Sequence, residues 1–221
     1  MAAAKTPRSA QRARVLDAYR GRGRQNSNLW LGYSVKQDQD LIFHSDRSFV
    51  HWLAFLESDP SVAGFYPISN ELSAVLEVGP ECAMVVDRSK QQLEVHVVAA
   101  AAREMTTVQT DSGLAAVRVI SQDELRARSR LAVHWLKAVN YAGMLRYMNV
   151  ATLMNQLAFT LAHRPSGTLE DLVEDLAGHD RASVFGAVVK AAIHGRLDLD
   201  LSSQGLCGAS RWTSRTAREQ Y

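Results

Sequence analysis

One stretch, residues 45–97, constrains the fold of this chain more than any other. Its first part has the i, i+3, i+4, i+7 spacing of an amphipathic helix face, carried by Phe49, Trp52, Leu53 and Leu56. Two apolar runs rich in valine follow, at residues 83–86 and 93–98, and a polar segment separates them. The stretch therefore predicts a helix next to an antiparallel strand pair, and with it a mixed α/β (α+β) fold.

The rest of the chain divides at Ser121. Before it we expect a β-hairpin and several strands, at residues 27–44, 62–67, 72–78, 105–110 and 115–119. After it we expect helices and then a strand pair, at residues 121–142, 150–162, 169–176, 181–194, 197–201 and 210–213. Helices followed by a β-hairpin are the order of a winged-helix domain, and an α-helical bundle with a strand tail is the alternative.

The basic charge of the chain lies at its two ends. Residues 1–24 carry a net charge of +6 and residues 211–221 a net charge of +2. The whole chain totals +2, so the body between the two ends carries −6. Basic arms of this kind suit a polyanion such as DNA, because each neutralised phosphate releases counterions; a solvated tail is the alternative. The arginines expected to contact DNA are Arg12, Arg14, Arg20, Arg22 and Arg24, and residues 9–19 are expected to form a helix.

Other features of the sequence indicate a cytoplasmic protein. The two cysteines, Cys82 and Cys207, are far apart and have no metal-site spacing. The N-terminus lacks the apolar core of a secretory signal, and the longest apolar run, residues 97–102, is too short to cross a bilayer. We therefore expect a reduced environment and no membrane partner.

Four short motifs follow one another along the chain. They are Leu56-Glu57-Ser58-Asp59-Pro60 at a helix end, Glu94-Val95-His96 on a strand, Ser121-Gln122-Asp123-Glu124-Leu125-Arg126 at a helix start, and His194-Gly195-Arg196-Leu197 near the end. Together they resemble the TnsA family, the endonuclease subunit of heteromeric cut-and-paste transposons. The resemblance implies a restriction-endonuclease-like domain at residues 27–120 and a helical, winged-helix domain at residues 121–213, with basic segments at 1–26 and 214–221.

The same resemblance locates a nuclease site and argues against its activity. Nucleases of this type hold Mg²⁺ with several carboxylates and use a lysine to polarise the attacking water. In the TnsA family these groups are a helix Glu, an Asp that opens one strand, and Glu-Val-Lys on the next. The matching positions are Phe49, Ala83, Glu94 and His96. Because only Glu94 keeps its carboxylate, we expect no catalytic residue, no metal and no cofactor.

The third helix of the second domain offers few groups that could bind DNA. Its basic residues are Arg181 and Lys190, with Arg196 at its exit, and acidic residues precede it. Our leading hypothesis is a catalytically inactive TnsA-like subunit that binds DNA, a transposase or both, and it could form a homo-oligomer. One alternative is an active Mg²⁺-dependent endonuclease that cuts transposon ends, its site rebuilt from Glu94 and His96 with Asp87 and His44 or His51. A second alternative is a winged-helix DNA-binding regulator.

Overall fold

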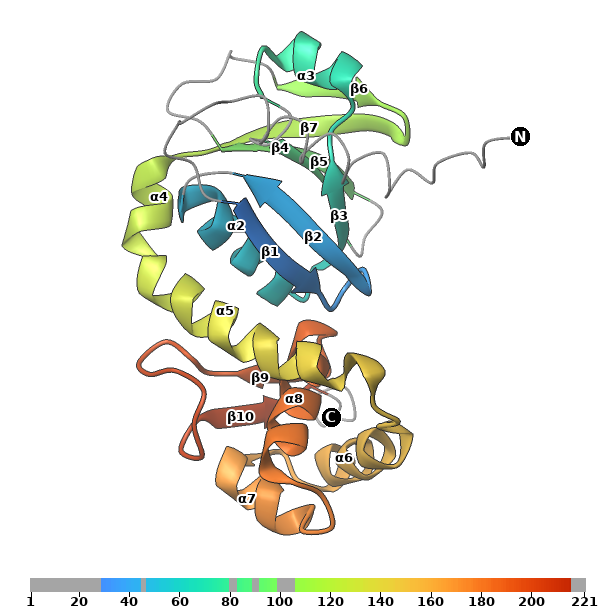
Figure 1. Cartoon of the computed structure of the whole chain (residues 1–221), viewed down its shortest axis with the longest axis vertical. Coiled ribbons are helices and arrows are strands. Elements are labelled where there is room, and N and C mark those ends of the chain that lie inside the picture. Colours follow the sequence, from blue (N-terminus) through green and yellow to red (C-terminus); the bar gives the residue numbers. More distant parts are fainter. Residues whose placement is uncertain (1–28, 45–46, 80–82, 89–91, 99–105, 216–221) are drawn as a thin grey trace, which may run out of the picture.

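The structure is a computed structural model, and it describes residues 29–44, 47–79, 83–88, 92–98 and 106–215 of the chain. Within these residues the fold is mixed α/β, as the sequence predicts. Figure 1 shows a part built around a β-sheet and a largely helical part, which the long helix α5 (Ser129–Met144) connects. The helix predicted at residues 9–19 and the five arginines of the N-terminal arm lie outside the described residues.

In the described part of the chain, five strands form a mixed sheet in the order β3-β4-β5-β7-β6. They are β3 (Val62–Pro67), β4 (Ala83–Arg88), β5 (Gln92–Val98), β6 (Thr107–Thr110) and β7 (Gly113–Ile120). β5 and β7 are parallel, and the other neighbours are antiparallel. Helix α2 (Arg47–Ser58) packs on one face of the sheet and α3 (Asn70–Leu76) on the other. Successive residues of a strand therefore face different helices.

Helix α3 corrects one prediction. The sequence predicts a strand at residues 72–78, and this prediction is wrong because most of these residues are helical. The side chain of Ser69 caps the helix by accepting a 3.2 Å hydrogen bond from the Leu72 N–H. Leu72 and Leu76 are buried one helical turn apart, a spacing that strand alternation also produces. Glu77 ends the helix in the left-handed conformation, at φ 56°.

The second half of the chain begins with two helices where the sequence predicts one. Ser121 caps α4 (Gln122–Ala127) through a 3.1 Å hydrogen bond from the Glu124 N–H, as the capping signal predicts. Arg128 then departs from helical geometry, at φ −109° and ψ 7°, and separates α4 from α5. The continuous helix predicted at residues 121–142 is therefore interrupted at Arg128.

Short elements follow α5 in the order helix, strand, helix, helix, strand, strand. They are α6 (Ala151–His163), β8 (Ser166–Thr168), α7 (Leu169–Asp175), α8 (Arg181–Ile193), β9 (Leu197–Leu199) and β10 (Arg211–Ser214), and the 3₁₀ turn η1 (Leu145–Tyr147) precedes them. The strands form an antiparallel sheet in the order β8-β10-β9. The sequence predicts all of these elements except β8 and the 3₁₀ turn. No helix in the described ranges is long and apolar enough to cross a membrane.

Helix α8 lies at the centre of this half and is buried on almost every side. Its residues from Ser183 to Val189 are all buried, and α5 packs against it. A methyl group added to Gly186 would lie 2.5 Å from the Tyr141 backbone carbonyl oxygen, so the two helices approach backbone to backbone at this point. Tyr141 also packs its ring against Phe185, with centroids 5.8 Å apart. The core around α8 continues to Ala54 of α2, which joins the two halves.

A hairpin covers the outer side of α2 and is fixed to it by a buried acid. The strands β1 (Leu29–Ser34) and β2 (Gln39–His44) pair antiparallel. The Glu57 carboxylate, 5% exposed, accepts hydrogen bonds from the Ser34 hydroxyl at 2.7 Å and the Lys36 N–H at 2.9 Å. The Lys36 ammonium in turn donates to the carbonyl oxygens of Leu56 and Asp59 at the end of α2. Burial lowers the pKa of Lys36 to about 8 and raises that of Glu57.

We predict that Gly186→Ala lowers the free energy of unfolding by about 1–3 kcal/mol, the usual cost of overpacking. Alanine favours a helix over glycine by about 1 kcal/mol, so a loss of stability reports the clash with α5. Gly143→Ala is the control on α5, because its added methyl would make an ordinary 3.4 Å contact with Tyr33. Urea denaturation measures both. Equal stability of Gly186→Ala and the unchanged chain would contradict the close approach.

We also predict that Glu57→Ala destabilises the chain by about 2 kcal/mol or more, because it leaves two buried donors without an acceptor. Ser58→Ala, a change at the neighbouring half-buried position, should cost less than about 0.5 kcal/mol, as is usual away from such features. Thermal unfolding of both variants measures the difference. A Glu57→Ala variant as stable as Ser58→Ala would rule out the anchoring role of Glu57.

Candidate functional site

Glu94 and His96 lie on β5 and face α2, where they form one chain of hydrogen bonds with Trp52. The Nδ1 atom of His96 accepts a 3.3 Å hydrogen bond from Trp52 Nε1, and its Nε2 atom lies 2.5 Å from Glu94 Oε2. An indole N–H can only donate. The neutral imidazole therefore carries its proton on Nε2 and donates it to Glu94.

Arg88 extends this chain of hydrogen bonds beyond Glu94. Its Nε atom lies 2.9 Å from Glu94 Oε1, and its Nη1 atom lies 3.2 Å from Asp59 Oδ2. Nη1 also donates a 2.6 Å hydrogen bond to the Ser61 hydroxyl. Both oxygens of Glu94 are thus bonded to protein donors, and the carboxylate is paired with a cation.

The surroundings keep His96 neutral and Glu94 ionised. Burial lowers the pKa of His96 and outweighs the opposing effect of Glu94. Partial burial raises the pKa of Glu94, but the hydrogen bonds from Arg88 and His96 outweigh it, so this pKa is lowered overall. His96 is therefore a buried neutral donor, and Glu94 is an acceptor whose charge Arg88 offsets.

Of the four positions expected at the nuclease site, the structure brings Glu94 and His96 together and places Ala83 on the opposite face of the sheet. Phe49 lies on α2 on the same side of the sheet as His96, but it is 1% exposed and packs its ring against Trp52 at 5.4 Å. Ala83 is paired with Val97 and lies in the core beneath α3, on the opposite face. The β4 residue opposite His96 is Met84, which is also buried.

The described residues around His96 do not fit a site for Mg²⁺, which requires several oxygen ligands. Asp87, which the rebuilt-site alternative uses, is paired with Leu93 and lies on the face away from Glu94. His51 lines a separate groove between α2 and α5, and the side chain of His44 lies outside the description. Among the described residues, no cluster of three His, Cys, Asp or Glu side chains could hold a metal ion. The one carboxylate beside His96 is already neutralised.

A cavity of about 290 Å³ lies next to this hydrogen-bonded chain, between α2, the sheet, α4 and α5. We call it the junction cavity. Its lining residues are Trp52, Phe55, Leu56, Ser58, Asp59, Arg88, His96, Arg118, Ile120, Glu124, Leu125, Arg128, Leu131 and Trp135.

The sequence did not identify Arg88, Trp52 or Arg128 as residues of a functional site. Arg88 and Trp52 lie within residues 45–97, but no local pattern shows that their side chains meet at Glu94 and His96.

The residues expected to bind DNA are spread over separate places. The five arginines of the arm lie outside the described residues. Arg181 forms an ion pair with Glu170 at 2.6 Å, and its guanidinium lies 5.1 Å from the centroid of the Phe185 ring. Lys190 is half-buried in the last turn of α8, and Arg196 is exposed just after it. The structure therefore does not gather them on one open face of α8.

Comparisons of this chain with protein-family models, with curated proteins and with solved structures found no match.

We predict that the chain loses stability as the pH falls below about 6.5, the ordinary pKa of histidine. Because the pKa of His96 is lowered on folding, the unfolded state binds more protons in this range and is favoured. The loss should be on the order of 1 kcal/mol per pH unit. The pKa of Glu94 is also lowered, so it contributes only below its ordinary value, near pH 4.5.

The measurement is urea denaturation at several pH values between neutral and mildly acidic. His96→Gln should flatten the dependence, and His194, whose pKa burial also lowers, accounts for a residual slope. His163→Gln, at an exposed position, is the control and should keep the original slope. An unchanged slope in His96→Gln would show that His96 is not held neutral.

Proposed function

We propose that this chain is a catalytically inactive, TnsA-like subunit that binds DNA and a transposase-type partner in DNA transposition or recombination. The observation that carries the proposal is the state of Glu94. A nuclease needs a carboxylate free to hold a metal and polarise water. Here Arg88 and His96 occupy both carboxylate oxygens.

Two features support a restriction-endonuclease-like first domain. Helix α2 precedes the antiparallel pair β4–β5, with β3 and α3 between them, and a helix before a strand pair is the order that the TnsA-type motifs imply. The Glu-x-His motif also lies on the inner strand β5, with its side chains directed to the helix that carries Phe49. These features give the frame of such a site, with apolar residues where ligands are expected.

The second half supports a winged-helix domain. After α4, α5 and the 3₁₀ turn, its elements run helix, strand, helix, helix, strand, strand, and the three strands pair in the order β8-β10-β9. In this arrangement α8 would be the helix that usually reads a DNA groove. Burial of α8 against α5 removes that surface, which favours contact with a protein and leaves DNA to the basic arms. This argues against the alternative of a winged-helix regulator.

We predict no cleavage of supercoiled plasmid by the purified chain with Mg²⁺ or Mn²⁺, with or without an added transposase of the proposed kind. The reason is that no described group of carboxylates could hold the metal. Glu94→Ala is the control variant. Cleavage that Glu94→Ala abolishes would overturn the proposal in favour of the active endonuclease, whereas cleavage equal in both proteins would indicate a contaminating nuclease.

We further predict that DNA binding depends on the arm. Replacing Arg12, Arg14, Arg20, Arg22 and Arg24 with glutamine should weaken binding and reduce the slope of log K against log salt by about 0.9 for each lost phosphate contact. Arg181→Gln is the matched control and should leave the slope unchanged, because Arg181 is paired with Glu170. Fluorescence anisotropy with a labelled DNA duplex, at several salt concentrations, measures the affinity and its salt dependence for both variants. A larger effect from Arg181→Gln would place the DNA at α8.

A further inference from the structure

We propose that the junction cavity binds a small aromatic anion, a flat ring that carries one phosphate or carboxylate group. This inference goes beyond the proposed function and does not depend on it. The volume of the cavity, about 290 Å³, lies near the lower end of the range of ligand pockets in proteins. It suits one ring with one acidic group.

The charges around the cavity favour an anion at one place. Its lining includes three arginines and two carboxylates, and His96 is neutral. Arg88 is paired with Asp59 and with Glu94 behind it, and Arg118 is paired with Glu124 at 2.9 Å. In the described part of the chain, Arg128 has no carboxylate within ion-pair distance. A ligand anion would supply the missing partner, and a planar guanidinium binds phosphate or carboxylate through two hydrogen bonds.

Aromatic side chains lie next to this cation. The central carbon of the Arg128 guanidinium lies over the Phe55 ring, 4.2 Å from its centroid. Trp52 and Trp135 contribute to the same lining. Apolar and aromatic walls with a few fixed polar groups are typical of sites for small ligands. The ring of the ligand would pack among these residues, and its acidic group would meet Arg128.

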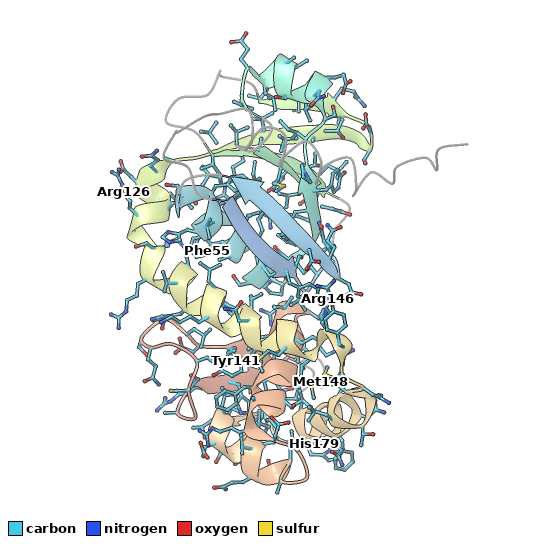
Figure 2. All side chains as sticks on the ribbon, in the orientation of Figure 1. Phe55, Arg126, Tyr141, Arg146, Met148 and His179 are labelled. Carbon is cyan, nitrogen blue, oxygen red and sulfur yellow. The ribbon has the colours of Figure 1, made fainter. Side chains whose placement is uncertain are left out.

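The chain contains a matched control for Arg128. Arg126 lies two residues away on α4 and has the same charge, but it does not line the cavity. Its guanidinium contacts Asp123 and Gln122 of its own helix. Figure 2 shows Arg126 on the outer side of α4, directed away from Phe55. A nonspecific charge effect would be equal for the two arginines, whereas a site in the cavity depends on Arg128 alone.

The experiment is a calorimetric and NMR titration of the full chain. Phenyl phosphate and 4-hydroxybenzoate are the two probes, and phenol and inorganic phosphate, each lacking one of the two features, are the controls. We expect saturable binding of at least one probe, with shifts of the indole N–H resonances of Trp52 and Trp135. The resonance of Trp212, which is buried against β8, should not move.

The variants decide whether the site is the junction cavity. Arg128→Gln should weaken binding about tenfold or more, the effect of losing a charge-assisted pair, and Arg126→Gln should change it less than about twofold. Phe55→Leu, a second variant, should also weaken binding while thermal unfolding verifies its fold. Failure of both probes to bind at millimolar concentration, equal loss from Arg126→Gln and Arg128→Gln, or binding of phosphate alone with equal affinity would overturn the proposal. None of these outcomes bears on plasmid cleavage, so the proposed function is judged separately.

Discussion

The packing of α5 against α8 on one side and α2 on the other is the constraint on which the rest of the structure depends. The side of α5 that enters the core carries small residues, Ala132, Ala138 and Ala142, which are almost fully buried. Small side chains allow helix backbones to approach closely, and Gly186 of α8 extends this to the Tyr141 carbonyl. Because α8 is buried in this way, it cannot also present its surface to a DNA groove. The packing therefore leaves little of the α8 surface for contact with any other molecule.

The chemistry of the first half follows from how the charge of Glu94 is compensated. A carboxylate in a low-dielectric site must be paired with a cation or bonded to donors, because an isolated charge there is strongly destabilised. In a metal-dependent nuclease the metal supplies that compensation, and here Arg88 and the Nε2 proton of His96 supply it. Protein groups therefore compensate the charge of Glu94 in full.

The sequence predicted most elements but not which side chains meet. Hydrophobic spacing located α2, β4, β5 and α8 to within a few residues, since each buries a continuous apolar face. It failed at α3, where a two-leucine spacing fits helix and strand equally. The resemblance to the TnsA family placed Ala83 at the expected site, but a shift of one residue moves a strand side chain to the opposite face, and Met84 is the residue that faces His96. Long-range contacts such as Arg88 with Asp59 leave no local pattern, so sequence reasoning could not find them.

The polar lining of the junction cavity explains why close packing of the two halves leaves a space between them. Phe55 packs against the cores on both sides, so the halves are held together around this point. An apolar gap there would be removed by small side-chain shifts, because unfilled volume loses dispersion contacts. This space instead has Arg118 and Arg128 on its lining, and both side chains are exposed to water. A polar cavity of this kind holds either water or a ligand that can replace its hydrogen bonds. The positive charge of Arg128 on this lining therefore favours an anion as the ligand.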